Sequence, residues 1–292
     1  MTTLAIVLAV FVGVSLGLLG GGGSILMVPL LAYVAGMDAK LAIATSLLAV
    51  GTTSAVGAIS HARAGRVQWR TALLFGATAM AGAYGGGHLA KFIPGTVLLV
   101  GFAVMMVATA IAMLRGRKNT EAGEERTREL PLAKIAVVGA AVGMVTGLIG
   151  AGGGFLLVPA LVLLGGLPMP IAVGTSLVII AMNSFAGLLG YLSSVRIDWA
   201  LGAALTAAAV AGALIGARFA GKVNPETLRK GFGWFVLIMA SVILGEEIHP
   251  AVGFTAAVLT VVAGAMTFAC TRYAACPLRR LTHRSTTTGA AA

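Results

Sequence analysis

Two glycine-rich breaks, each ending in a proline, interrupt this chain at equivalent places in its two halves. The first runs from Gly17 to Pro29 (GLLGGGGSILMVP) and the second from Gly147 to Pro159 (GLIGAGGGFLLVP), an offset of 130 residues. The sequence around them is 59% hydrophobic and only 10% charged, which is typical of a protein that crosses a bilayer many times. Irregular backbone at membrane depth needs protein or a polar cavity to satisfy its amides. We therefore expect other helices to enclose both breaks.

Apolar runs predict an all-α polytopic membrane protein built from two homologous repeats. In the first half we expect helices at 3–18, 24–36, 41–60, 69–91 and 95–114, and in the second half at 132–148, 154–166, 170–193, 199–220 and 227–245, followed by an unmatched helix at 250–270. The corresponding division is a repeat at 1–114, a cytoplasmic linker at 115–131, a second repeat at 132–247, an extra transmembrane helix at 248–270 and a basic cytoplasmic tail at 271–292.

The charges of the loops predict that the two repeats have opposite orientations in the membrane. Positive charge collects on the cytoplasmic side. The loop that carries Arg63, Arg66 and Arg70 is basic, whereas its equivalent balances Arg196 with Asp198. Inversion needs an odd number of crossings per repeat, so each glycine-broken segment is expected to be a re-entrant hairpin beside three spanning helices. The alternative makes each broken segment one kinked span and the repeats parallel.

The glycines of the two breaks are the predicted substrate site. Glycine permits positive φ and a close backbone approach, so successive amides can converge on an anion, helped by the positive ends of the half-helices. The predicted binding residues are Gly20, Gly21, Gly22, Gly23, Ser24, Gly150, Gly152, Gly153 and Gly154, with the duplicated pairs Thr45-Ser46 and Thr175-Ser176 and the mid-helix Asn183. The alternative roles are close helix packing for the glycines and hydrogen bonds to carbonyls of the same helix for the hydroxyls.

Three further residues are candidates for a vestibule or for coupling. Arg66 and Arg196 each precede a tryptophan at equivalent junctions, where they attract anions or anchor the helix at the membrane interface. His61 carries a proton or is a solvated residue at a helix end.

The acidic residues lie outside the predicted spans, which favours an anionic or neutral substrate over a cation. We expect no metal, no cofactor, no nucleic-acid partner and no catalytic residue. The net charge of +11 lies in short loops that meet the lipid bilayer. A hydrolase built on Ser24 and His61 lacks an equivalent in the second repeat, and a dinucleotide site lacks its strand and acidic residue.

Both breaks, each followed by Ala-x-x-Thr-Ser, resemble the motifs of the sulfite exporter TauE/SafE family, as do Arg66-Val67-Gln68-Trp69 and Arg196-Ile197-Asp198-Trp199. The resemblance covers about residues 5 to 270. It implies a carrier in the bacterial inner membrane that exports sulfite, organosulfonates or related anions, and leaves a homodimer open. We therefore expect alternating access coupled to protons, with an anion channel of the same fold as the alternative. The eight spans usual for the family differ from the crossings counted above.

Overall fold

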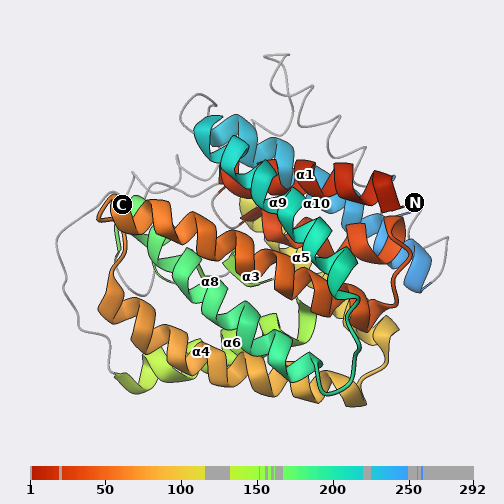
Figure 1. The fold of residues 1–292 in the computed structure, drawn as a ribbon, viewed down its shortest axis with the longest axis horizontal. Coiled ribbons are helices and arrows are strands. Elements are labelled where there is room, and N and C mark those ends of the chain that lie inside the picture. The colour runs from red at the N-terminus through yellow and green to blue at the C-terminus, as the bar shows by residue number, and fades with distance from the viewer. Residues whose placement is uncertain are drawn as a thin grey trace, which may run out of the picture.

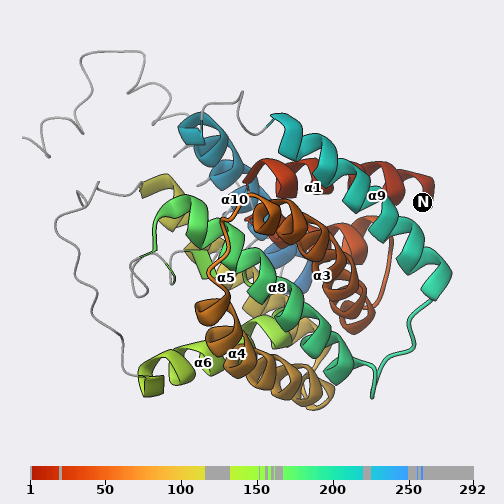
Figure 2. The same cartoon turned by 60° about the vertical axis from the view of Figure 1, so that its left-hand side comes forward.

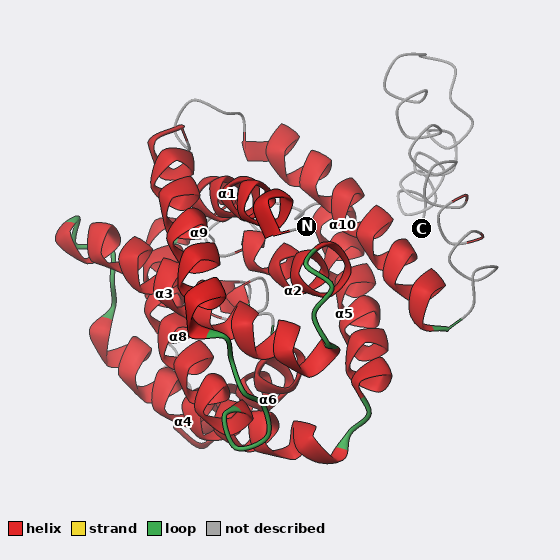
Figure 3. Ribbon diagram, turned by 45° about the vertical axis from the view of Figure 1, so that its right-hand side comes forward, coloured by secondary structure: helices red, strands yellow, loops and turns green. Residues whose placement is uncertain are grey.

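The computed structural model describes residues 2–19, 22–115, 132–150, 152–154, 157–158, 161, 167–219, 225–248, 255 and 258. Within these residues the chain is helical and contains no strand (Figure 3). The predictions for Gly20, Gly21, the linker after residue 115, most of the segments 154–166 and 250–270, and the tail at 271–292 lie outside this part of the chain.

Long helices occupy the predicted apolar runs. They are α1 (Thr2–Leu19), α3 (Ala39–Arg63), α4 (Trp69–Leu89), α5 (Gly95–Arg115), α6 (Leu132–Ile149), α8 (Met169–Tyr191), α9 (Trp199–Phe219) and α10 (Pro225–Glu247). A short 3₁₀ helix, Ala90–Phe92, follows α4. The first break contains a 3₁₀ helix (Gly22–Leu26) and one short α segment (Met27–Pro29), and a π-helix (Leu30–Val34) follows it. The predicted half-helix at 24–36 is therefore irregular, with Pro29 immediately before the π-helix.

Among the described residues, three helices are long and apolar enough to cross a membrane: Ala39–Arg63, Pro170–Tyr191 and Trp199–Phe219. Shorter apolar helices cover Leu4–Leu18, Ser24–Val34, Gly95–Ile111 and Ala136–Ile149. Such helices fit a membrane protein with both full spans and shorter elements.

The helices pack in the spatial order α6, α4, α8, α3, α9 and α1, with α5 beside α10. Both views place α3 and α8 between the α4–α6 pair and the α1–α9 pair (Figures 1 and 2). The centre of the molecule is therefore the crossing of α3 and α8.

The α1–α9 pair is parallel and its backbones are in direct contact. A Cβ atom added at Gly13 would overlap the carbonyl oxygen of Ala209, and one added at Gly17 would overlap that of Ala213. Because the residue numbers of these contacts rise together along the two helices, the helices are parallel. Small residues are what permit this close approach.

The α4–α6 pair has the same geometry. A Cβ atom at Gly143 would overlap the carbonyl oxygen of Ala79, and one at Gly147 would overlap that of Ala83. Shifting each α1–α9 contact by 130 residues, with the partners exchanged, gives these two contacts. The duplicated small residues therefore lie at equivalent helix contacts.

α3 and α8 cross in opposite directions. A Cβ atom at Gly51 would lie 3.1 Å from the Cβ of Ser184, and one at Gly57 would lie 3.5 Å from the Cδ1 of Leu177. Residue numbers rise along α3 as they fall along α8, so the two helices are antiparallel.

Side-chain contacts identify the two ends of the bundle. At one end, Gln68 N donates to Thr175 Oγ1 (3.0 Å), which joins the loop after α3 to the start of α8. At the other end, Lys40 Nζ donates to the carbonyl of Lys91 (3.1 Å), which joins the start of α3 to the region after α4. We call these the Arg66 end and the Glu247 end. Arg66 lies in the loop after α3, and Glu247, the last residue of α10, lines one cavity with Asp38 and Ala39 at the start of α3.

Candidate functional site

The second glycine turn, described at Gly150 and at 152–154, contains three residues whose backbone only glycine adopts without strain. Gly150, Gly152 and Gly153 have φ of 74°, 64° and 75°. A residue with a Cβ pays about 1–2 kcal/mol to adopt this left-handed conformation. The second run of glycines is therefore required by the local backbone as well as by the packing around it.

Helices α3 and α8 enclose this turn. A Cβ atom at Gly150 would lie 2.5 Å from Ile43 Cγ2, and one at Gly152 would lie 2.5 Å from Val50 Cγ1, both on α3. The Cβ atom added at Gly152 would also lie 3.3 Å from the hydroxyl oxygen of Ser184 on α8. The expectation that protein encloses the irregular backbone is met at this turn.

Ser46 joins the turn to α3. Its buried hydroxyl lies 2.7 Å from the carbonyl oxygen of Gly150 and 2.8 Å from that of Ile43. A hydroxyl has one proton, so the two carbonyls share it. Ser46, predicted as a binding residue, therefore lies at the second glycine turn.

Asn183 and Thr146 form a buried polar pair beside the same turn. Asn183 Nδ2 donates to Thr146 Oγ1 (2.8 Å), and Thr146 Oγ1 donates to the carbonyl of Gly143 (3.0 Å). Thr146 has already used its proton, so its oxygen can only accept from Asn183, and this fixes the orientation of the amide. A Cβ at Gly153 would lie 2.5 Å from Thr146 Cγ2, which places the pair against the turn.

Three polar atoms at this crossing have no hydrogen-bond partner in the described structure: Asn183 Oδ1, Ser184 Oγ and Ser54 Oγ. Ser54 and Ser184 are 0% exposed and Asn183 is 2% exposed. A buried polar group without a partner costs about 1–3 kcal/mol. By contrast, four other hydroxyls of α3 donate to carbonyls of their own helix; they belong to Ser46, Thr52, Thr53 and Ser60.

The other predicted binding residues lie elsewhere or have local partners. Thr175 accepts from Gln68 N at the Arg66 end, and Ser176 donates to the carbonyl of Val173, repeating the bond from Ser46 to Ile43. Thr45 is buried on α3. In the first break, Gly22 and Gly23 begin the 3₁₀ helix and Ser24 is fully buried within it.

Arg66 and Arg196 are exposed at opposite ends of the bundle. Trp69 and Trp199, which follow them, are 55% and 57% exposed, as expected for aromatic anchors at a membrane interface. His61 is half-buried in the last turn of α3, near Gly174 at the Arg66 end. The structure does not bring these three candidates to the glycine turn.

The buried polar side chains of the described residues are all neutral: Ser24, Thr45, Ser46, Thr53, Ser54, Thr109, Thr146, Thr175, Ser176, Asn183, Ser184, Thr206 and Ser241. A site near the glycine turn therefore has hydroxyl, amide and backbone groups with which to bind a ligand. These groups can hold a small anion by hydrogen bonds without a compensating cation.

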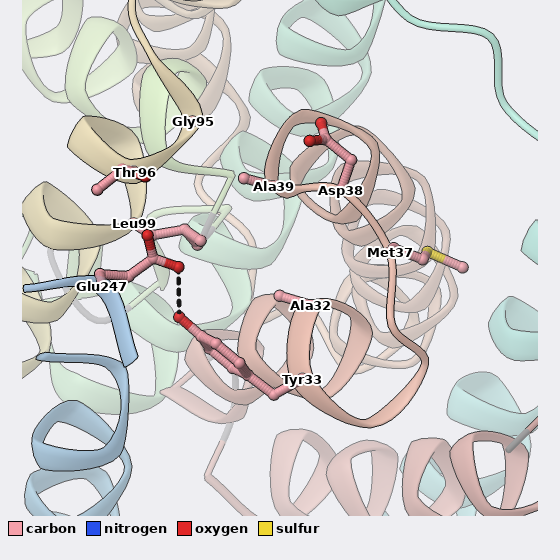
Figure 4. A pocket seen from close by; sticks show the side chains of 9 residues that line it. All are labelled: Ala32, Tyr33, Met37, Asp38, Ala39, Gly95, Thr96, Leu99 and Glu247. Atoms are coloured by element: carbon pink, nitrogen blue, oxygen red, sulfur yellow. Dashed lines mark hydrogen bonds between the residues drawn. The ribbon is translucent and has the colours of Figure 1, made fainter. Parts of the chain in front are cut away.

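A cavity of about 290 Å³ opens at the Glu247 end (Figure 4). It is lined by Ala32, Tyr33, Met37, Asp38, Ala39, Gly95, Thr96, Leu99 and Glu247. Tyr33 OH donates to Glu247 Oε1 (3.1 Å) across it. The carboxylates of Asp38 and Glu247 make its potential negative, which disfavours an anion. The glycine turn is therefore the better candidate for an anion site.

Sequence reasoning missed Thr146, Ser54 and Ser184. The repeat offset could have identified the two serines, because Ser54 and Ser184 are 130 residues apart. Thr146 has Leu16 at its equivalent position, so the repeat carries no signal for it.

Comparisons with known proteins find a family match and several relatives. The sequence profile of the family described as sulfite exporter TauE/SafE matches residues 5–243. A Xylella fastidiosa (strain 9a5c) protein named "Probable membrane transporter protein" is 35% identical over 78% of this chain and 89% of its own. The "Probable membrane transporter protein YdhB" of Bacillus subtilis is 27% identical over 82% of this chain and 98% of its own.

A third relative is the "Probable membrane transporter protein MJ0441" of Methanocaldococcus jannaschii, which is 28% identical over 65% of this chain and 72% of its own. No solved structure matches the chain. The family match spans both glycine breaks and every long helix up to most of α10. This chain therefore belongs to the sulfite exporter TauE/SafE family of membrane proteins.

Proposed function

We propose that the protein is a secondary transporter that exports small sulfur-containing anions, such as sulfite or organosulfonates, across the bacterial inner membrane. It does so by alternating access coupled to protons. The observation that carries the proposal is the second glycine turn, enclosed where α3 and α8 cross and surrounded by buried groups that are polar but uncharged. Neutral donors at a backbone break suit a small anion better than a cation.

The directions of the helices support inverted repeats. α3 and α8 occupy equivalent positions in the two halves, and they cross antiparallel. A two-fold axis in the membrane plane relates equivalent helices in this way, whereas an axis along the membrane normal would make them parallel. The α1–α9 contacts become the α4–α6 contacts when the two halves are interchanged, which fits the same axis.

The first broken segment fits a re-entrant hairpin. α1 runs parallel to α9, which begins at the Glu247 end, so α1 also begins there. After the glycines the chain reaches Tyr33, whose hydroxyl donates to Glu247 at that same end. A segment that starts and finishes at one end has entered the bundle and returned, as the odd number of crossings requires.

Charge supports a cytoplasmic location for the Arg66 end. The described ionisable side chains that lie exposed there are Arg63, Arg66, Arg70, Arg218 and Lys230. At the Glu247 end, basic and acidic side chains are mixed: Lys40, Lys91 and Arg196 lie with Asp38, Asp198, Glu246 and Glu247. An excess of positive charge is typical of the cytoplasmic side, which supports this orientation.

Purified protein in liposomes tests the transport function. We expect sulfite flux that saturates with concentration and accelerates under an imposed pH gradient. Protein-free liposomes and a neutral amino acid as solute are the controls. A conductance that is linear in voltage and insensitive to the pH gradient would establish a channel instead, and the absence of flux of any sulfur anion would overturn the proposal.

Cysteine labelling tests the inverted orientation. Ala64 and Ser194 are exposed loop residues 130 positions apart, so Ala64→Cys and Ser194→Cys form a matched pair. In a background with Cys270 and Cys276 replaced by serine, we expect an impermeant maleimide added to intact cells to label position 194 and not position 64. Labelling of both positions from the outside would exclude inversion.

A further inference from the structure

We infer that the site at the second glycine turn binds its anion in a protonated form, as a hydrogen oxyanion whose O–H donates to Asn183 Oδ1. The inference rests on the proposed function and narrows its substrate to sulfite in the form of hydrogen sulfite, because the sulfonate group of an organosulfonate has no O–H. Its basis is an amide oxygen that is buried, unpartnered and fixed in orientation beside the second glycine turn.

The hydrogen bonds of Asn183 determine what the site offers a ligand. Its Nδ2 group donates to Thr146 Oγ1, and the hydroxyl of Thr146 in turn donates to the carbonyl of Gly143. The amide oxygen therefore cannot exchange places with the nitrogen without breaking this network. A carbonyl oxygen accepts hydrogen bonds only, so it repels a fully deprotonated oxyanion and attracts one that carries a proton.

Ser184 supplies the complementary group. Its hydroxyl, also without a partner, adjoins Gly152, and it follows Asn183 directly on α8. A hydroxyl can donate to a charged oxygen of the ligand while the amide oxygen accepts from the ligand O–H. One donor near Gly152 and one acceptor near Gly153 match a hydrogen oxyanion, which has charged oxygens and also a protonated oxygen.

The amide exists in only one of the two halves. Position 53, equivalent to Asn183, is a threonine that donates to Ala49 of its own helix, and position 16, equivalent to Thr146, is a leucine. The general architecture of the repeats does not require the Asn183–Thr146 pair. Its presence beside the second turn makes the binding site asymmetric.

The charged and titratable side chains of the neighbouring helices lie away from Asn183. On α3 they are Lys40, His61 and Arg63, on α4 Arg70, Tyr84 and His88, on α6 Lys134 in the first turn, and on α8 Tyr191. Lys40 donates to the carbonyl of Lys91, Tyr191 donates to that of Leu148, and the rest lie near helix ends. A pH dependence of binding is thus expected to follow the protonation of the ligand.

Binding of sulfite and methanesulfonate to the full-length protein in detergent tests the inference. Methanesulfonate is an anion of the same single charge as hydrogen sulfite, but has no O–H. At about pH 6 we expect it to bind at least about tenfold more weakly, since a site built to hydrogen-bond a hydroxyl rejects an analogue without one. The affinity for total sulfite should fall by about tenfold per pH unit above neutrality, as hydrogen sulfite is lost.

Asn183→Thr, which installs the residue of the equivalent position, should bring the affinities for sulfite and methanesulfonate close together. Thr52→Val is the matched control, because that hydroxyl bonds Leu48 of its own helix, and it should keep the preference for sulfite. An unchanged preference in Asn183→Thr, as a resident water on Oδ1 would produce, overturns the inference, as does wild-type binding that is equal for both anions. Sulfite flux that persists in those cases leaves the proposed function standing, whereas the absence of both binding and flux overturns both.

Discussion

Gly82→Leu is expected to abolish the folded protein. A Cβ atom at Gly82 on α4 would overlap the carbonyl oxygen of Ala140 and lie 2.8 Å from the amide nitrogen of Met144, both on α6. These are backbone atoms, so no side-chain rotation relieves the overlap and the helices must separate. We expect a loss of about 3 kcal/mol or more, measured as the thermal stability of the detergent-solubilised protein by size-exclusion chromatography.

Gly85→Leu on the same helix is the matched control. Gly85 is exposed, and a Cβ there would meet nothing within 4 Å. Leucine also favours the helix over glycine by up to about 1 kcal/mol, so this variant should be as stable as the wild type or slightly more stable. Gly212 is the equivalent of Gly82 in the second half, and a Cβ atom there would overlap the carbonyl oxygen of Val10. Gly212→Leu should therefore show the same loss of thermal stability. Equal stability of Gly82→Leu and Gly85→Leu would contradict the α4–α6 contact.

The positions of the helices could be predicted because apolar length and loop charge determine them locally. The predicted span at 41–60 is α3, which the structure extends to Ala39–Arg63, beginning where Asp38 accepts from Lys40 N. For the irregular segment after Gly22, the sequence predicted that the helix is interrupted, but not which kind of helix follows. Whether a segment after a glycine run becomes 3₁₀, α or π helix depends on neighbours that are distant in sequence.

The candidate site was predictable only in part. Gly152 and Ser46 belong to duplicated motifs, and Asn183 is a rare carboxamide within an apolar helix. Whether Ser184 finds a partner depends instead on how α3 and α8 cross, since a serine in a helix ordinarily bonds its own backbone. The pairing of Asn183 with Thr146 joins two helices and has no local signal. Tertiary contacts therefore decided which polar residues are free to bind a ligand.

Gly152→Ala is expected to reduce sulfite flux in liposomes by at least about tenfold, the factor that corresponds to about 1.4 kcal/mol of lost ligand binding. The left-handed backbone at φ 64° costs alanine about 1–2 kcal/mol. The new methyl group would also lie 2.5 Å from Cγ1 of Val50, a β-branched side chain that cannot rotate freely. Gly36→Ala isolates the first cost, because Gly36 has φ 69° and open space around it. It should lose a little stability and keep its flux.

Adding Val50→Ala to Gly152→Ala separates stability from transport. Removing the valine methyls relieves the overlap, so we expect part of the lost thermal stability to return. Flux should stay low, because the methyl group at position 152 still lies 3.3 Å from the hydroxyl of Ser184 and occupies the space beside the unpartnered group. If flux returned together with stability, the glycines would serve packing alone. Persistent loss of flux in a stable double variant would instead require that the ligand approach the backbone at Gly152.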